Sequence, residues 1–330
     1  MRYLGVFGSP IRHSLSPLLH NAVLQSYNLP YCYGRYELST RNIADICLES
    51  RQDSARGFSH LPSHSSQPAR SNPLLDAFYA LNLHGANITL PFKELAFISA
   101  TRHSALAHHI GAVNTLVRSS EGLLGYNTDA PGFLASLLLG GFSTPKMPDE
   151  KLDELAILSP LLCASTSRQC IDSALIIGAG GSAKALAVML HLCGVELLVA
   201  NRSNRAREFF STRGIPYCTF DELDSSKPYT LVINATSASI GGELPLGALR
   251  LEELFSHAKI AYDLMYGHEL PFVGLARSCG VACQDGADML ILQAACALML
   301  FCPELAGGDA YSVKQVFAIM QSVFPRASSA

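Results

Sequence analysis

Short apolar runs alternate with stretches of helical periodicity through the first third of the chain. This alternation is typical of an α/β domain with a mostly parallel sheet. The predicted strands are Tyr3–Phe7, Tyr31–Glu37 and Leu83–Thr89, and the predicted helices are Pro17–Gln25, Pro73–Leu83 and Pro91–Ala100.

The same alternation begins again at Ala174 and predicts a second α/β domain. Its predicted strands are Ala174–Ile177, Glu196–Ala200, Leu231–Asn234 and Ile260–Leu264, with a helix that starts at Ser182. Two apolar helices, Met289–Phe301 and Val313–Val323, are predicted to end the chain.

Two stretches interrupt the pattern. Residues 50–72 are rich in Ser, His, Pro, Arg and Gln, and we interpret them as a surface insertion that is dispensable for folding. Residues 141–172 follow a predicted helix at Gly132–Leu139 and contain Pro145, Pro148 and Pro160. We interpret this second stretch as an irregular connection at the entrance to the second domain.

Composition excludes several classes of function. With 330 residues and a formal net charge of −3, the chain has no basic surplus that would favour nucleic acid or an anionic membrane as partner. The first residues run quickly into Ser-Pro-Ile and do not resemble a signal peptide, so we expect a cytoplasmic protein. The ten cysteines lack C-x-x-C spacing, and neither they nor the histidines suggest a metal site.

A glycine-rich turn gives the clearest chemical signal. Gly178, Gly180 and Ala183 form a G-x-G-x-x-A pattern between a predicted strand and a predicted helix. Such glycines let the backbone approach a pyrophosphate, and the N–H groups of the helix start bind it. The predicted cofactor-binding residues of this turn are Gly178, Ala179, Gly180, Gly181 and Ser182.

The end of the next strand indicates which dinucleotide is bound. NAD enzymes usually have a carboxylate there, which binds the ribose 2′-hydroxyl. This chain instead has Asn201, Arg202 and Ser203, with Arg205 and Arg207 close behind. An arginine can bind a 2′-phosphate that a carboxylate would repel, so the sequence predicts NADP(H). The alternative is an ordinary solvated basic turn.

Several motifs occur together in one order. They are Ser14–Asn21 (S-x-S-P-x-x-H-N), Asn87–Lys93 (N-I-T-L-P-F-K), Gly111–Thr115 (G-A-V-N-T) and Asn127–Asp129 (N-T-D), followed by the glycine turn, Asn234–Ser237 and Asp285-Gly286…Gln293. The chain thereby resembles the shikimate dehydrogenase family over nearly its whole length, apart from the two insertions.

The resemblance implies a two-domain α/β fold. It comprises an α/β substrate-binding domain at 1–128, a Rossmann-type NADP-binding domain at 129–286, and C-terminal helices at 287–330 that return to the first domain. The implied activity is reversible, NADPH-dependent reduction of 3-dehydroshikimate to shikimate, in a cleft between the domains, by a monomer or homodimer. The alternatives are a dehydrogenase that prefers quinate or NAD, and a catalytically silent NADP-binding regulator.

The resemblance assigns Lys93 and Asp129 as the catalytic pair. Pro91 fits the first position of a helix, which places Lys93 in the first turn. A cation there opposes the helix dipole and should lose its proton more easily, which suits a proton shuttle. The alternatives are an ordinary surface lysine and, for Asp129, an N-cap of the following helix.

The resemblance also assigns the groups that bind substrate and cofactor. Ser14, Ser16 and Tyr266 would hold the substrate carboxylate, although Ser16 before Pro17 could be only a helix N-cap. Neutral hydrogen-bonding side chains suit ring hydroxyls, each of which donates and accepts. The ring-binding residues are Asn87, Thr89, Asn114 and Gln293, and the further cofactor-binding residues are Thr236, Ser237 and Gly286.

One departure from the family pattern concerns the loop after Asn234. Ser239 stands where the family often has glycine, so the resemblance does not define the backbone path of that loop. The Lys93 and Asp129 motifs are intact.

Overall fold

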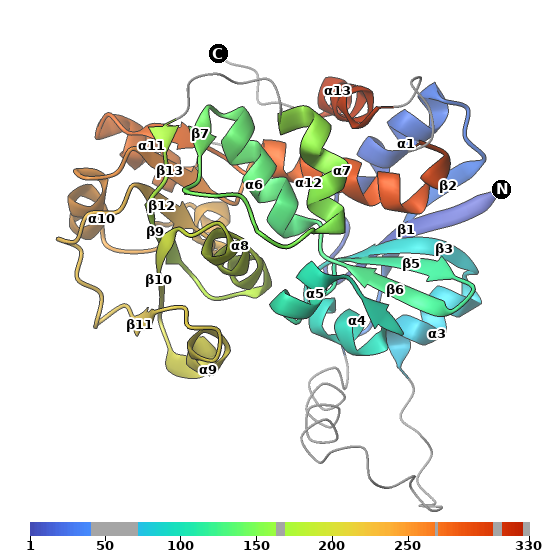
Figure 1. Ribbon diagram of the computed structural model, residues 1–330, viewed down its shortest axis with the longest axis horizontal. Helices are drawn as coiled ribbons and strands as arrows, with labels where there is room; N and C mark the ends of the chain where they lie inside the picture. Colours follow the sequence, from blue (N-terminus) through green and yellow to red (C-terminus); the bar gives the residue numbers. More distant parts are fainter. Residues whose placement is uncertain (41–71, 163–168, 268–269, 306–311, 326–330) are drawn as a thin grey trace, which may run out of the picture. The chain divides into compact units, whose positions relative to one another are not determined.

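The computed structural model describes residues 1–40, 72–162, 169–267, 270–305 and 312–325, and of the insertion at 50–72 only Asn72 lies within them. The chain divides into two compact units, which Figure 1 colours along the sequence. Unit 1 comprises Met1–Asn127 and Ala297–Ala306, and unit 2 comprises Thr128–Cys296 and Gly307–Ala330.

Unit 1 has a six-stranded mixed sheet with the order β2-β1-β3-β5-β6-β4. The predicted parallel strands β1, β2 and β3 are present, whereas β5 runs antiparallel to both β3 and β6. The strands are β1 (Arg2–Gly8), β2 (Tyr31–Glu37), β3 (Leu83–Ile88), β4 (Arg102–His103), β5 (Thr115–Ser119) and β6 (Gly122–Tyr126).

The described helices that pack on this sheet include α1 (Ser16–Ser26), α3 (Pro73–Ala80), α4 (Lys93–Ser99) and α5 (Ala105–Ile110). Phe7, Phe78 and Phe92 lie in a buried cluster that joins the sheet to its helices. Asn72 is the N-cap of α3, where its side-chain oxygen accepts hydrogen bonds from the N–H groups of Leu74 and Leu75. Asn72 therefore belongs to the folded body and not to the predicted insertion.

Unit 2 has a six-stranded sheet, entirely parallel, with the order β11-β10-β9-β12-β13-β14. This is the doubly wound order 3-2-1-4-5-6, and the order reverses between β9 and β12. In folds with this order, ligands generally bind near the point of reversal. The strands are β9 (Ser173–Ile177), β10 (Glu196–Asn201), β11 (Tyr217–Thr219), β12 (Leu231–Asn234), β13 (Ile260–Asp263) and β14 (Ala282–Gln284).

The helices of unit 2 cover an apolar sheet whose central strands are almost fully buried. A cluster built from Leu175, Val232, Phe255 and Phe272 joins the sheet to its helices. Besides the helix within residues 141–172, unit 2 contains α6 (Asp129–Leu139), α8 (Gly181–Leu192), α9 (Arg207–Ser211), α10 (Ala248–Phe255), α11 (Pro271–Ser278), the first part of α12 (Ala287–Phe301) and α13 (Val313–Val323).

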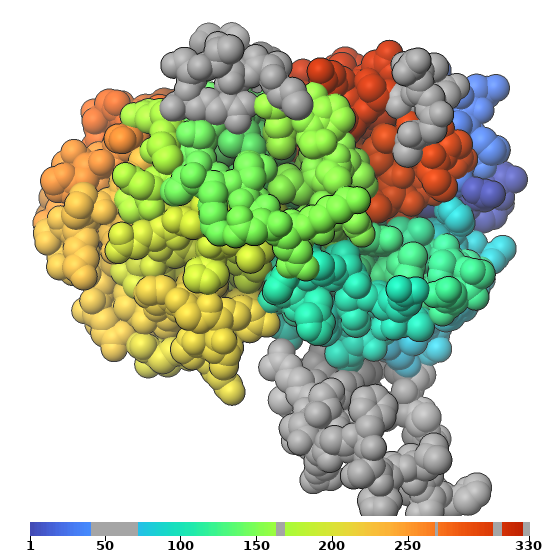
Figure 2. Space-filling view, viewed as in Figure 1, coloured from blue at the N-terminus to red at the C-terminus, as the bar shows by residue number. Residues whose placement is uncertain are grey.

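The stretch at 141–172 differs from the irregular connection that we expected. It contains β7 (Phe142–Ser143) paired with β8 (Gln169–Cys170), and α7 (Asp153–Leu162). Pro160 is tolerated inside α7 because Ser159 Oγ donates to the Ala156 carbonyl (2.8 Å), the group to which a residue-160 N–H would have donated. Figure 2 shows the green residues of this stretch as part of the packed surface of unit 2.

The two C-terminal helices divide between the units. Helix α12 begins in unit 2 and its last residues, from Ala297, belong to unit 1, whereas α13 belongs to unit 2. This differs from the expectation that both helices pack on the substrate domain. Among the residues that the structure describes, no helix is long and apolar enough to cross a membrane. Within the same ranges, no three His, Cys, Asp or Glu side chains form a cluster that could hold a metal ion.

Candidate active site

In unit 1 the predicted substrate-binding residues gather at one edge of the sheet. Ser14 and Ser16 follow the carboxyl end of β1, and Asn87 and Thr89 lie at the carboxyl end of the parallel strand β3. Strand β5 is antiparallel, so Asn114, immediately before it, reaches the same edge. The topology thus brings together side chains from segments a hundred residues apart.

The two serines bind each other at the start of α1. Ser14 Oγ donates to Ser16 Oγ (3.2 Å) and accepts from the Ser16 N–H (3.3 Å). Leu15 is the N-cap of α1 and Ser16 is its first helical residue, so the interpretation of Ser16 as an N-cap is wrong. Both hydroxyls therefore remain candidates for binding a ligand carboxylate.

Asn87 and Asn114 belong to one buried hydrogen-bond chain. Asn87 Nδ2 donates to Thr115 Oγ1 (3.0 Å), which donates to Asn114 Oδ1 (3.0 Å). Asn87 is 5% exposed and Asn114 is 3% exposed. Buried amides in fixed orientations can distinguish donors from acceptors on a ring. Sequence reasoning did not select Thr115, although it closes the G-A-V-N-T motif.

Lys93 is the first residue of α4 and is half-buried. The helix starts two residues later than predicted because residues 89–92 form a turn, in which the Phe92 N–H donates to the Thr89 carbonyl (3.0 Å). The Lys93 carbonyl accepts from the Val113 N–H (3.1 Å), which ties the start of α4 to the segment before Asn114. Lys93 thus lies in the first turn, as expected, and next to the polar edge of unit 1.

Asp129 is the first residue of α6 in unit 2 and is 7% exposed. The N-cap position is occupied by Thr128, so the interpretation of Asp129 as the N-cap is wrong. Thr128 Oγ1 donates to Gln293 Oε1 (3.4 Å), and Gln293 Nε2 donates to the Leu290 carbonyl (3.0 Å). Gln293, which is predicted to bind the ring, is thereby held beside the start of α6.

Tyr266 follows β13, and its ring lies 5.7 Å from that of Phe324. Burial raises the pKa of the Tyr266 phenol above its usual value, so the hydroxyl stays protonated and able to donate. A protonated phenol is a suitable donor to a carboxylate.

The glycine turn has the geometry that a pyrophosphate site requires. Gly178 has φ of 110°, in a region that favours glycine, and a β-carbon there would meet the Ala235 backbone at 3.0 Å. Gly180 is the N-cap of α8, and a β-carbon on it would meet no atom within 4 Å. The helix start therefore opens to free space, which fits a dinucleotide at the switch point.

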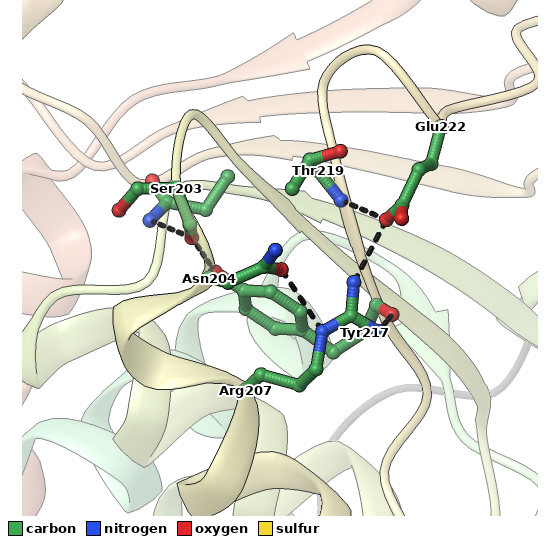
Figure 3. Close-up of polar contacts among 7 residues, drawn as sticks. Ser203, Asn204, Arg207, Tyr217, Thr219 and Glu222 are labelled. Carbon is green, nitrogen blue, oxygen red and sulfur yellow. Dashed lines mark hydrogen bonds and ion pairs between the residues drawn. The ribbon is translucent and has the colours of Figure 1, made fainter.

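The arginines after β10 have different environments. Arg207 donates to Glu222 Oε2 (2.8 Å), Asn204 Oδ1 (2.9 Å) and the Tyr217 carbonyl (3.1 Å), as Figure 3 shows. Arg202 and Arg205 are exposed and pair with no carboxylate among the residues that the structure describes. Of these three arginines, Arg202 and Arg205 are therefore the ones whose charge is available to a phosphate.

The loop that carries Arg202 is held from both sides. Asn201 Nδ2 donates to the Ser203 carbonyl (3.3 Å), to which the Tyr217 hydroxyl also donates. The Glu222 carboxylate that binds Arg207 also accepts from the Thr219 N–H (2.8 Å). These hydrogen bonds within the protein define the path of the loop (Figure 3).

The other predicted cofactor-binding residues flank the switch point. Thr236 Oγ1 donates to Asn234 Oδ1 (2.7 Å), and Ser237 is the N-cap of a short 3-10 helix, Ala238–Gly241. A β-carbon at Gly286 would overlap the Leu264 carbonyl oxygen. Gly286 thus has a packing reason to be glycine, whether or not it binds a cofactor.

Comparisons with known proteins show the family to which the chain is similar. Residues 6–60 and 63–116 match the family of the shikimate dehydrogenase substrate binding domain. The chain is 37% identical over 324 residues to a shikimate dehydrogenase (NADP(+)) of Helicobacter pylori, with 98% of this chain and 99% of the relative covered. It is 34% identical to one from Aeromonas salmonicida, with 89% of each covered.

Among solved structures, the chain is similar to a shikimate 5-dehydrogenase of Thermus thermophilus in complex with NADP(H) and shikimate. The TM-score is 0.66 at 27% identity, over 98% of this chain and 100% of the other. The chain belongs to the shikimate dehydrogenase family, and the two-domain α/β fold that the sequence predicts is confirmed.

Proposed function

We propose that the chain is an NADP-dependent shikimate dehydrogenase, which reversibly reduces 3-dehydroshikimate to shikimate. One observation carries the proposal. A buried set of oriented amides and hydroxyls beside Lys93 occurs in the same chain as a doubly wound unit whose dinucleotide edge has two arginines that pair with no described carboxylate. The buried amides and hydroxyls suit a polyhydroxylated ring, and the two arginines suit a 2′-phosphate. We propose cytoplasmic action on free small molecules, as a monomer or homodimer.

The polar edge of unit 1 would bind the ring. The Ser14 and Ser16 hydroxyls would donate to the carboxylate, with Tyr266 of unit 2 as a further donor. Asn87, Thr89 and Asn114 would bind ring hydroxyls, with Gln293 of unit 2. In unit 2 the cofactor would lie along the start of α8. Its contacts would come from Gly178, Ala179, Gly180, Gly181, Ser182, Asn201, Arg202, Ser203, Arg205, Thr236, Ser237 and Gly286.

Bound NADPH would supply the hydride for the ring ketone. The protein must then supply a proton to the oxygen that becomes a hydroxyl, and we assign this step to the Lys93 ammonium. Asp129, almost fully buried at the start of α6, would accept a hydrogen bond from the neighbouring ring hydroxyl and so fix the orientation of the ring. In the reverse direction neutral Lys93 would take the hydroxyl proton.

Initial rates at 340 nm with shikimate and quinate, each with NADP⁺ and NAD⁺, test the proposal. We expect turnover with shikimate and NADP⁺ to exceed that of the other three pairs. Lys93→Ala should lower kcat by at least about 100-fold with a small change in the KM for shikimate. Lys314→Ala, on the exposed face of α13, is a matched control and should leave both constants unchanged.

Two results would contradict the proposal. Near-normal turnover of folded Lys93→Ala would remove this lysine from the mechanism. If the wild-type chain bound NADP⁺ and turned over neither shikimate nor quinate, it would be a silent NADP-binding relative instead.

A further inference from the structure

Tyr33 of β2 is buried at the polar edge of unit 1 and has no part in the proposed transfer of hydride and proton. It is 3% exposed, and its hydroxyl donates to Asn87 Oδ1 (2.7 Å). The two residues are 54 positions apart and lie on strands separated by β1. A buried phenol whose hydroxyl donates a hydrogen bond to Asn87, an amide proposed to bind the ligand, needs an explanation.

Two adjacent residues of α1 hold Tyr33 in place. Asn21 binds both backbone groups of Tyr33: its Nδ2 donates to the Tyr33 carbonyl (2.9 Å) and its Oδ1 accepts from the Tyr33 N–H (3.0 Å). The His20 ring stacks on the Tyr33 ring, with centroids 4.1 Å apart and planes 3° apart. Phe301 packs on His20 from another side, at 6.0 Å between centroids. The phenol therefore has one position.

The hydroxyl of Tyr33 acts as a donor. Burial raises the pKa of this phenol well above its usual value, against the opposing effect of a contact with Ser16. Burial also lowers the pKa of His20 to about 3, against the opposing effect of a contact with the Asn87 side chain, so the stacked imidazole is neutral and adds no charge beside the phenol. Tyr33 and the stacked His20 ring therefore both stay neutral in the physiological pH range.

The direction of the hydrogen bonds at Asn87 follows from its partners. The Asn114 carbonyl can only accept, and it accepts from Asn87 Nδ2 (3.4 Å). Nδ2 also donates to Thr115 Oγ1, so Oδ1 is the atom that faces Tyr33. With Tyr33 donating to it, Asn87 Oδ1 keeps one lone pair, and Asn87 can accept a hydrogen bond from a ligand hydroxyl. Tyr33 thus holds the oxygen end of the amide, while Asn114 and Thr115 hold its nitrogen end.

We propose that Tyr33 is a positioning residue for substrate, held by His20 and Asn21, which fixes the Asn87 carboxamide as an acceptor for a hydroxyl of the substrate ring. The inference rests on the proposed function, because it requires that Asn87 bind the substrate. It also gives a role to His20 and Asn21 of the S-x-S-P-x-x-H-N motif. These two residues hold Tyr33, which in turn orients the Asn87 carboxamide on β3.

Steady-state kinetics of Tyr33→Phe test this role. We expect the KM for shikimate to rise about tenfold, the factor that corresponds to one hydrogen bond, with kcat and the KM for NADP⁺ changed less than about threefold. The matched control is Tyr31→Phe, in the same strand. Tyr31 is also buried, and its hydroxyl donates to Glu304 Oε1 (2.8 Å), away from Asn87. This control should lower thermal stability and leave the KM for shikimate unchanged.

A double-mutant cycle separates positioning from general damage. If Tyr33 acts through Asn87, Tyr33→Phe should not raise the KM for shikimate further in an Asn87→Ala background. Thr115→Val removes the partner at the other end of the Asn87 amide and should also raise this KM. It serves as the test if Tyr33→Phe does not fold.

Three outcomes are distinguishable. A wild-type chain without shikimate turnover would overturn the proposed function itself. An active wild type with an unchanged KM in Tyr33→Phe would overturn only the role of Tyr33. Equal losses in Tyr31→Phe and Tyr33→Phe, or additive effects in the cycle, would reduce Tyr33 to a residue of general stability.

Discussion

Arg202→Asp should reverse the cofactor preference of this chain. Arg202 directly follows β10, is exposed, and pairs with no carboxylate in the described parts of the structure. The loop around it is fixed independently, because Ser203 is held by Asn201 and Tyr217. The substitution should therefore remove a phosphate ligand without moving the backbone. It also places a carboxylate at the position where NAD enzymes usually have one.

The magnitude depends on how an exposed guanidinium binds a phosphate. A hydrogen bond between these groups contributes about 1.5–3 kcal/mol, and exposure favours the lower half of that range. Repulsion between the new carboxylate and the 2′-phosphate adds about 1 kcal/mol, because water screens both groups. A total of about 2.5–3 kcal/mol corresponds to roughly 70- to 160-fold weaker binding of NADP⁺. Binding of NAD⁺, which lacks the phosphate, should stay equal or improve.

The assay measures Kd for NADP⁺ and NAD⁺ by fluorescence titration, together with both KM values at saturating shikimate. Added salt should weaken NADP⁺ binding more in the wild type than in the variant, because screening acts on the arginine–phosphate attraction. Arg277→Asp, on the exposed end of α11, is the matched control with the same change of charge. Equal weakening of both cofactors in Arg202→Asp would refute the assignment and indicate a distorted loop.

Two further predictions concern stability. Asn72→Ala removes the cap of α3 and should lower stability by about 1 kcal/mol, or roughly 2–4 °C in Tm; an unchanged Tm would contradict the role of this cap. His20 is neutral when folded because burial lowers its pKa from 6.5 to about 3, so the unfolded chain binds the extra proton. The free energy of unfolding should fall by up to about 1.4 kcal/mol per pH unit as pH drops from 6.5 towards 3. In His20→Phe the free energy of unfolding should depend less steeply on pH, because the variant lacks this histidine. An equal pH dependence of the unfolding free energy in wild type and variant would contradict this role of His20.

The sequence predicted the bounds of those strands and helices whose apolar periodicity ends at polar flanking residues. Strands Tyr31–Glu37 and Leu231–Asn234 and helix Val313–Val323 have the predicted bounds, because apolar periodicity and polar flanks coincide there. The hairpin of β5 and β6 was not predicted, because its strands are short and Gly122 and Gly125 weaken the strand pattern.

Helix α7 was missed for a different reason. The three prolines of the 141–172 stretch suggested irregular structure, but two of them precede the helix and the third has a compensating hydroxyl in Ser159. A side chain that replaces a backbone donor is a specific arrangement, and composition alone does not reveal it.

Motifs predict which residues form the candidate site, but they do not predict the contacts that support those residues. Tyr33 reaches Asn87 across β1, and Thr115 reaches it across an antiparallel pair that the sequence did not predict. No spacing in the sequence encodes either contact, since both depend on strand order. The sequence therefore predicted groups that would touch a ligand and did not predict the side chains that bind Asn87 within the protein.

The departure at Ser239 illustrates how such contacts compensate for a change of residue type. Ser239 is buried, and its hydroxyl donates to Asp263 Oδ2 (2.5 Å), while Asn234 Nδ2 donates to both Ser239 Oγ (3.2 Å) and Asp263 Oδ2 (3.0 Å). Burial raises the pKa of Asp263, and the bonds from Ser239 and Asn234 oppose that rise. A glycine at 239 would remove one of these donors from a carboxylate that water does not reach. The serine therefore ties the ends of β12 and β13 together beside the switch point, so the loop keeps a defined path in the absence of the glycine.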